Sequence, residues 1–270
     1  MTPLIYFTGS VSLALLAGAG VLHLLPKLGP PGRALSAWLC KGIGLDLMIT
    51  YFTVAPIIVG PALLGWWGLP AAIAGQVAGM LIWQWLHELA HPAARKGPRI
   101  VHTLNRSVGR WRNHTAVWIT ALAVPLFWLV RLAEWIVYPP LTWIVRLPKY
   151  DSADWVNVSR QKFEGLVGHD LIWCLYCDWM TGIWSLGSEM LRNVESYWCP
   201  IRFYSEKKCE NCAIDFPDIN DGWVKADGNM ADVVKVLETK HAGGDHSWFG
   251  HPRRVTIEGK PQRPELENSE

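Results

Sequence analysis

Five of the six cysteines of this 270-residue chain lie between residues 174 and 212. They are Cys174, Cys177, Cys199, Cys209 and Cys212, and four of them form two C-x2-C pairs. Each pair can bind a metal ion as a unit, so the two pairs can offer four thiolates to one tetrahedral ion. Thiolates select zinc or an iron–sulfur cluster. The sequence therefore predicts a metal site formed by these cysteines.

The two pairs would be held in different ways. Cys174 and Cys177 lie three residues apart in a stretch that predicts a helix, which places them on one face. Cys209 and Cys212 belong to a Lys-Lys-Cys-Glu-Asn-Cys loop. Zinc would be structural, whereas a cluster would make the chain an electron carrier or a redox sensor. Disulfides and unrelated free thiols are the alternatives, and disulfides would require this region to lie outside the cytoplasm.

Three further side chains bear on this site. Cys199 could replace one member of a pair, or it could be a packed thiol. His169 is another possible ligand. Cys40 stands apart from the other cysteines, and we expect it to be a small apolar packing residue.

A second candidate site is the string His87-Glu88-Leu89-Ala90-His91. On a helix its two imidazoles lie one turn apart on one face, a spacing that suits a metal ion, and Glu88 could be the base for a metal-bound water. His102 or His114, in or just after the following basic loop, could supply a further ligand. The alternative is that these side chains are simply solvated at a helix end, at the level of the lipid headgroups.

This string resembles the zinc-protease motif, and it is also similar to the first histidine box of membrane-bound alkane hydroxylases and desaturases. The first resemblance implies a zinc hydrolase, and the second implies a di-iron site at the cytoplasmic end of membrane helices. Both resemblances cover five residues. An intramembrane protease would carry a later Leu-Asp-Gly and a desaturase later His-x-x-His-His boxes. The chain has only Leu45-Asp46-Leu47, upstream of the string, and none of those boxes.

The segments that must position these residues are long and apolar. Residues 4–25 carry no formal charge and can form one crossing, because a bilayer core needs about 20 apolar residues of helix. The 41 uncharged residues between Asp46 and Glu88 predict a hairpin of two helices, with its turn at residues 65–70. Residues 113–145 are apolar too, but they fit a kinked crossing, a re-entrant hairpin or a segment on the membrane surface.

Smaller patterns within these segments predict how the helices pack. Arg131 and Glu134 lie three apart, so on a helix they can pair and lower the cost of burying each other. Small residues four apart indicate close approach of helices. They form two stripes, Ser10–Ala14–Gly18 and Ala71–Gly75–Gly79. Pro26, Pro30 and Pro31 predict a stiff connector after the first helix. In the second half, residues 162–196 predict one long or two abutting helices, and residues 230–240 a short one.

Charge divides the chain into two parts. Residues 1–146 hold 11 Lys and Arg but 3 Asp and Glu, whereas residues 147–270 hold 14 Lys and Arg and 20 Asp and Glu. The positive-inside rule places the basic connectors of the first half in the cytoplasm, and Arg146 and Lys149 favour a cytoplasmic exit for the second half. Nucleic-acid binding is disfavoured, because the basic residues lie among membrane-length apolar runs.

These observations predict a mainly α-helical integral membrane protein with three to four membrane segments. The expected domains are a transmembrane domain at 1–146, a small Cys-rich domain of helices and loops at 147–242, and a flexible polar tail at 243–270. We expect the chain to lie in a cell inner membrane with the C-terminal domain in the cytoplasm. Its expected partners are the lipid bilayer and other membrane subunits or a redox partner.

The expected function is that of a redox-active membrane metalloprotein, which transfers electrons or supports oxidation at the membrane. Its cofactor would be an iron–sulfur cluster or a mixed Cys/His metal site, with a possible second metal at His87 and His91. One alternative is a scaffold or assembly subunit with structural zinc. The other is a membrane zinc hydrolase that uses His87, Glu88 and His91.

Overall fold

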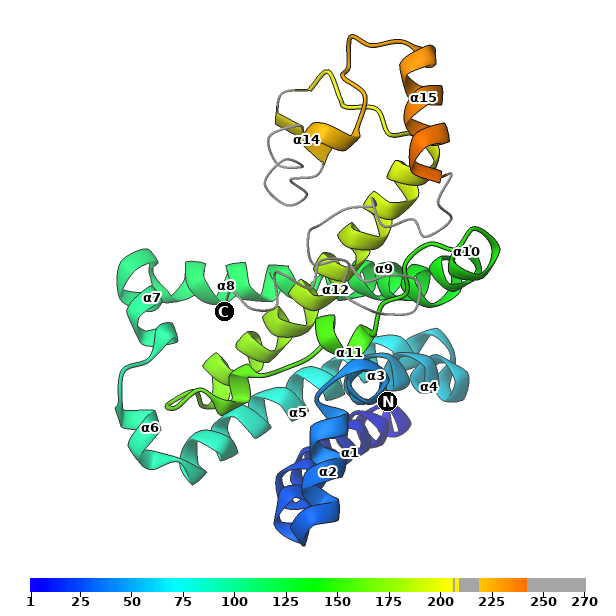
Figure 1. Cartoon of the computed structure of the whole chain (residues 1–270). Coiled ribbons are helices and arrows are strands. Elements are labelled where there is room, and N and C mark those ends of the chain that lie inside the picture. Colours follow the sequence, from blue (N-terminus) through cyan, green and yellow to red (C-terminus); the bar gives the residue numbers. More distant parts are fainter. Residues whose placement is uncertain (206, 209–218, 242–270) are drawn as a thin grey trace. The chain divides into compact units, whose positions relative to one another are not determined.

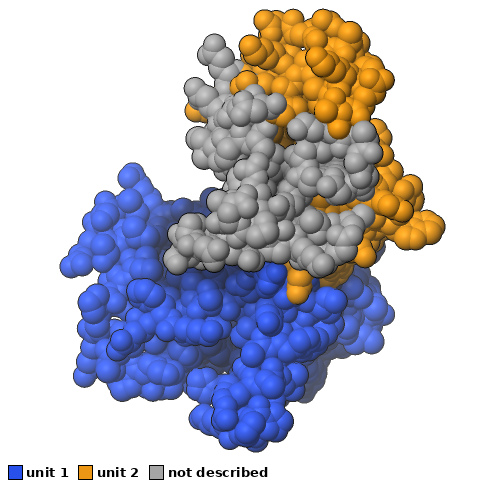
Figure 2. Space-filling view, in the orientation of Figure 1, with its two compact units in different colours: residues 1–124, 152–182 blue, residues 125–151, 183–270 orange. Residues whose placement is uncertain are grey.

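The computed structural model describes residues 1–205, 207–208 and 219–241 (Figure 1). Helices form most of these residues, and no strand occurs among them, as the sequence predicts. The chain divides into two compact units, one of residues 1–124 and 152–182 and one of residues 125–151 and 183–270 (Figure 2). The predicted domain boundary after residue 146 stays a prediction. The predicted tail at 243–270 lies outside the described residues.

Within the described part of the chain, three segments are long and apolar enough to cross a membrane. They are Thr2–Leu39, Gly42–Ala90 and Arg110–Ile144, with mean hydropathies of 1.8, 2.0 and 1.9. No more than 17% of the most apolar window of any of them is buried. Their apolar side chains therefore face outward and need an apolar environment. This is compatible with the predicted membrane protein.

The first segment corrects one expectation from the prolines. Helix α1 (Thr2–Leu24) is followed by a short 3-10 turn, η1 (Leu25–Leu28), and then by another helix, α2 (Gly29–Leu39). The expected connector is thus largely helical. Pro30 and Pro31 are compatible with α2 because they lie in its first turn, where a backbone N–H has no partner within the helix.

The second segment is the expected hairpin. Its first arm consists of α3 (Gly42–Ile49), a π-helical turn, η2 (Thr50–Val54), and α4 (Ala55–Leu64). The chain reverses at η3 (Gly65–Trp67), where the sequence predicts the turn, and α5 (Gly68–Ala90) is the second arm. Gly60 and Gly68 bring the arms together, since a Cβ on Gly68 would lie 1.9 Å from the carbonyl oxygen of Gly60.

Helices α1 and α5 pack in parallel with a constant sequence offset. Thr8 donates to the carbonyl of Ala71 at 3.1 Å, and Ser12 donates to that of Gly75 at 2.8 Å, so both pairs are 63 residues apart. The Ala71–Gly75–Gly79 stripe therefore faces α1 as expected. The Ser10–Ala14–Gly18 stripe does not face α5: Ala14 accepts a hydrogen bond from Tyr51, and the same ring lies against Gly18.

The rest of the first unit consists of shorter helices and the first half of α12. They are α6 (Pro92–Lys96), α7 (Ile100–Val108), α8 (Arg110–Ala121), α11 (Ser152–Trp155), the 3-10 turn η4 (Arg160–Lys162) and α12 (Gly168–Trp198). The helix predicted within residues 162–196 is single and starts at Gly168. Two backbone bonds, Gly42 N–H to Val156 O and Val158 N–H to Cys40 O, join residues 40–42 to residues 156–158.

The second unit contains most of α9 (Val124–Ile136), α10 (Tyr138–Ile144), the second half of α12, α14 (Ile219–Gly222) and α15 (Met230–His241). Asn193 of α12 donates to the hydroxyls of both Tyr138 and Tyr150 in its core. The predicted pairing of Arg131 with Glu134 is confirmed, and both residues are buried. Helix α15 agrees with the helix expected at 230–240.

Candidate functional site

The first unit contains a pocket of about 240 Å³ between α7, α8, η4 and the first turns of α12. Its apolar wall consists of Ile100, Val101, Leu104, Val117 and Trp173. Its polar side chains are Asn113, Arg160, His169, Asp170, Cys174 and Cys177. The pocket thus brings together two of the cysteines and the histidine that the sequence singled out.

Cys174 and Cys177 form a pair on one face of α12. Both are half-buried free thiols. Helix geometry places the Cα atoms of residues three apart at about 5 Å, within the range of about 4.4–6.8 Å that a disulfide requires. The two thiols can therefore oxidise to a disulfide without a large movement of the backbone.

Arg160 is the charged group beside these thiols. It lines the pocket together with Cys174 and Cys177, and its positive charge acts on both thiols. The Asp178 carboxylate holds Arg160 in place, accepting from the backbone N–H of Arg160 at 3.0 Å and pairing with its Nε at 3.1 Å. Burial raises the pKa of the Cys174 thiol, and the positive charge of Arg160 opposes that rise. Cys174 is accordingly a neutral thiol at neutral pH.

His169 completes the polar side of the pocket. Its Nε2 is buried and has no hydrogen-bond partner among the described residues, and its Nδ1 lies 3.6 Å from Asp170 Oδ1. The ring of His114 lies edge-on to that of His169, with the ring centres 5.0 Å apart. His102, the other histidine considered from the sequence, is exposed on α7.

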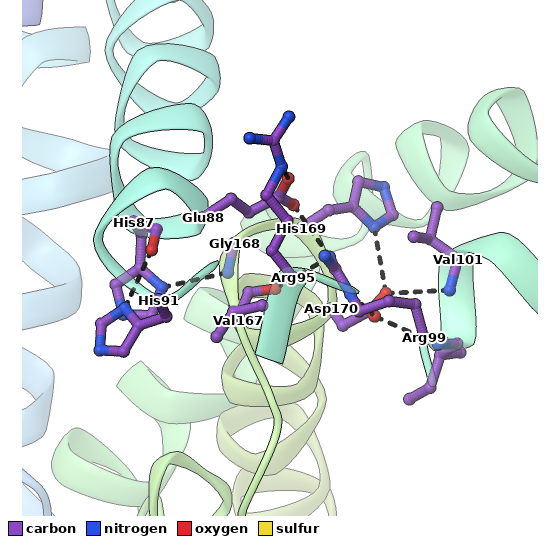
Figure 3. Close-up of polar contacts among 11 residues, drawn as sticks. His87, Glu88, His91, Arg95, Arg99, Val101, Val167, Gly168, His169 and Asp170 are labelled. Atoms are coloured by element: carbon purple, nitrogen blue, oxygen red, sulfur yellow. Dashed lines mark hydrogen bonds and ion pairs between the residues drawn. The ribbon is translucent and has the colours of Figure 1, made fainter. Parts of the chain in front are cut away.

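Asp170 fixes one wall of the pocket to another. Its carboxylate accepts from the backbone N–H groups of Ile100 at 3.1 Å and Val101 at 3.0 Å, which are the free donors at the start of α7 (Figure 3). It also accepts from Arg99 Nε at 2.7 Å. Despite burial, which opposes ionisation, its hydrogen bonds from Arg99 and from the backbone N–H of Val101 hold the pKa of Asp170 below its ordinary value.

Glu88 belongs to the same network. Its carboxylate accepts from Arg99 Nη2 at 2.9 Å and lies 3.9 Å from Arg95 Nε (Figure 3). The first residue of α12, Gly168, packs against Glu88 and has a φ of +52°, and a Cβ there would lie 2.4 Å from Glu88 Cγ. Glycine is therefore required at this position. These contacts indicate that Glu88 acts as a counter-charge to Arg99.

His87 and His91 lie next to Glu88 with their rings stacked, and His23 from the end of α1 is the third ring of the group. The ring centres of His87 and His91 are 4.4 Å apart, and that of His23 lies 6.2 Å and 6.3 Å from them. His87 Nδ1 accepts from the backbone N–H of Gly168 at 3.2 Å. In the neutral ring the proton then lies on Nε2. The predicted second metal stays a prediction.

The remaining cysteines are not assembled by the described part of the chain. Cys199 belongs to the second unit, and Cys209 and Cys212 lie outside the described residues. Within residues 1–205, 207–208 and 219–241, no group of three His, Cys, Asp or Glu side chains is arranged to hold a metal ion. The metal site of five cysteines therefore stays a prediction.

Sequence reasoning missed Arg160, Asp178 and His23. The offset of 63 residues between α1 and α5 would have placed His23 beside residue 86, next to His87. Arg160 comes from a turn far from any motif, and no pattern in the sequence links it to Cys177. No protein-family model, curated protein or solved structure matches this chain.

Proposed function

We propose that this chain is a membrane-bound redox protein in which Cys174 and Cys177 cycle between a dithiol and a disulfide. The observation that carries the proposal is the position of both thiols in one pocket beside Arg160. A cation next to a cysteine stabilises the thiolate, which is the form that attacks in thiol–disulfide exchange. We assign this attack to Cys177, which lines the pocket together with Arg160.

The balance of the reaction is simple. Each thiol loses one proton, one S–S bond forms, and two electrons pass to the oxidant. Both the dithiol and the disulfide are neutral, which suits a half-buried position. Asp178 acts as a positioning residue because it holds Arg160 beside the thiols.

A mixed Cys/His metal site is the second candidate. It is supported by the presence of His169 and Asp170 in the same pocket as the two thiols, and Cys209 and Cys212 would have to join from outside the described residues. Against this candidate, no group of three His, Cys, Asp or Glu side chains within the described residues is arranged to hold a metal ion. We therefore rank the dithiol first.

The test is a redox titration of the full chain in detergent, in mixtures of reduced and oxidised dithiothreitol. Free thiols are trapped by alkylation and assigned by mass spectrometry of the peptides. We expect Cys174 and Cys177 to be protected together in one reversible two-electron transition, and C174S to leave Cys177 free at every potential. C40S is the matched control and should leave the transition unchanged. If both thiols are alkylated at all potentials, the dithiol proposal is wrong.

The metal content of the full chain, purified in detergent under anaerobic conditions, separates the two candidates. Iron or zinc bound in a fixed ratio to the chain, and lost in C174S, would favour the metal site. The same titration without bound metal would favour the dithiol.

A further inference from the structure

The pocket beside the two thiols is suited to an electron acceptor, and three of its features indicate which kind. They are its size, the character of its walls and its place in the chain. The inference below rests on the proposed dithiol function and names the substrate class of the same site.

The size of the pocket admits one small ring. Its volume of about 240 Å³ is below the range of about 300–1,000 Å³ typical of sites for drug-sized ligands. The walls offer the aliphatic side chains of Leu104 and Val117 and the large aromatic surface of Trp173. Aromatic rings favour offset or edge contacts with another flat ring. A flat, weakly polar head group fits these walls better than a charged or strongly hydrated one.

The polar atoms of the pocket suit a ring that carries oxygen atoms. The guanidinium of Arg160 can donate to a carbonyl oxygen. The buried Nε2 of His169 has no hydrogen-bond partner within the described part of the chain, so it is available to a polar atom of a ligand. In a neutral imidazole this nitrogen accepts from a hydroxyl group in one tautomer and donates to a carbonyl oxygen in the other. One donor and one acceptor match a group that changes from carbonyl to hydroxyl on reduction.

The place of the pocket connects it with the lipid phase. Asn113 and Val117 line it from α8, and both belong to the segment Arg110–Ile144, which is apolar enough to cross a membrane. A ligand with an apolar tail can place its ring in the pocket and its tail along this apolar segment.

We propose that the pocket binds the ring of a membrane-soluble quinone, which oxidises Cys174 and Cys177 to a disulfide. The S–H bonds of both cysteines break and one S–S bond forms. The two electrons and two protons pass to the quinone, whose carbonyl groups become the hydroxyls of a hydroquinone. Neither side of the reaction needs another reactant. Arg160 and His169 hold the ring oxygens.

The experiment uses the full chain in detergent, reduced and freed of reductant under anaerobic conditions. The probe is a short-tailed benzoquinone whose ring is fully substituted, so that a thiol cannot displace a ring hydrogen and form a permanent adduct. Hydroquinone is followed by its ultraviolet absorption, and the disulfide by alkylation and mass spectrometry. We expect one hydroquinone for each disulfide, a rate that saturates with quinone, and full reversal of the mass change by dithiothreitol.

A pocket-filling variant tests where the quinone reacts. V117F adds an aromatic ring to the wall and should slow oxidation by the quinone about tenfold or more, since a small displacement of reacting groups has large effects on rate. Oxidised dithiothreitol, a water-soluble disulfide that the cysteine thiolate attacks, should oxidise V117F within about twofold of the wild-type rate. L104F is a second pocket-filling variant. It replaces V117F in this test if V117F unfolds at a lower temperature than the wild type.

The outcomes separate the two proposals. If oxidised dithiothreitol forms the disulfide but the quinone yields no hydroquinone, the quinone inference is wrong and the dithiol function stands. If V117F and L104F both react with quinone at the wild-type rate, the reaction occurs outside the pocket and the inference is overturned. If no oxidant forms a reversible disulfide, the proposed function fails and the inference fails with it.

Discussion

Arg99 and Asp170 form an ion pair that is buried on both sides. The Nε of Arg99 lies 2.7 Å from Asp170 Oδ2, and the two side chains are 1% and 3% exposed. The residues are 71 positions apart, so this contact fixes the start of α7 to the first turn of α12. Glu88 contacts the same guanidinium through Nη2. One cation is thus held between two carboxylates beside the candidate redox pocket.

Removing this cation should destabilise the first unit. In R99M the carboxylates of Asp170 and Glu88 would remain close together without the charge between them, and breaking a buried ion pair costs about 3–5 kcal/mol. R95M is the matched control, because Arg95 is 48% exposed and lies 3.9 Å from Glu88. That exposed pair should contribute about 1 kcal/mol or less. Thermal unfolding followed by circular dichroism measures both, and equal losses would contradict the assigned role of Arg99.

The same pair predicts how stability depends on pH. The pKa of Asp170 is lower in the folded chain than its ordinary value of 3.8. Asp170 therefore contributes stability that is fully present above pH 3.8 and is lost as the pH falls through its folded pKa. D170N removes this titration and should be less stable than the wild type at neutral pH. The difference in unfolding temperature between the two should shrink below pH 3.8, and a constant difference would be evidence against the shifted pKa.

The packing of α1 on α5 predicts opposite effects for two glycine substitutions. In G75A the new Cβ would lie 2.8 Å from both the Thr8 carbonyl oxygen and Val11 Cβ, so the helices must move apart. Such overpacking costs about 1–3 kcal/mol. Gly20 lies in α1 with no neighbour within 4 Å of a new Cβ, and G20A should stabilise the helix by about 0.5–1 kcal/mol. The measurement is the unfolding temperature of both variants in the same detergent. Equal unfolding temperatures for G75A and G20A would refute the described interface between α1 and α5.

Local patterns predicted the helices well, and contacts between distant residues were the part that sequence could not supply. The uncharged stretch between Asp46 and Glu88 was enough to predict the hairpin, because the length of a segment and its turn residues are local properties of the sequence. The role of Glu88 was not predictable in this way. Its partner Arg99 appeared in the sequence as one of many basic loop residues, and Asp170 lies 71 positions beyond Arg99. Cys174 and Cys177 were found by their spacing, whereas Arg160 beside them is placed there by the fold.

The buried pair of Arg131 and Glu134 in the second unit predicts non-additive substitutions. The helical spacing of three residues lets them pair, and both are buried. R131M alone leaves the carboxylate buried without this ion pair, and breaking such a pair costs about 3–5 kcal/mol. The double variant R131M/E134L removes both charges and should be more stable than R131M, because buried pairs are often replaced by apolar residues with little loss. Thermal unfolding of the wild type, R131M, E134L and the double variant gives the coupling energy. A double variant that loses the sum of the single losses would show that the pair is not coupled.

The contact of Arg160 with the thiols predicts the reactivity of Cys174. Burial raises the pKa of Cys174 above its ordinary value of 9.0, and the charge of Arg160 opposes that rise. R160Q removes the charge, so the thiolate fraction at pH 8 should fall, by about tenfold for each unit that the pKa rises. R160K keeps the charge and should retain most of the wild-type rate.

The measurement is the rate of alkylation of Cys174 and Cys177 by iodoacetamide between about pH 7 and pH 10, a range that brackets an ordinary thiol pKa. Mass spectrometry of the α12 peptide resolves these thiols from the other cysteines. In R160Q we expect the alkylation profiles of Cys174 and Cys177 to shift to higher pH. Cys199, in the other unit, should keep its wild-type profile and serves as an internal control. Identical profiles for R160Q, R160K and the wild type would show that the guanidinium does not act on the thiols. The main support for the dithiol proposal would then be lost.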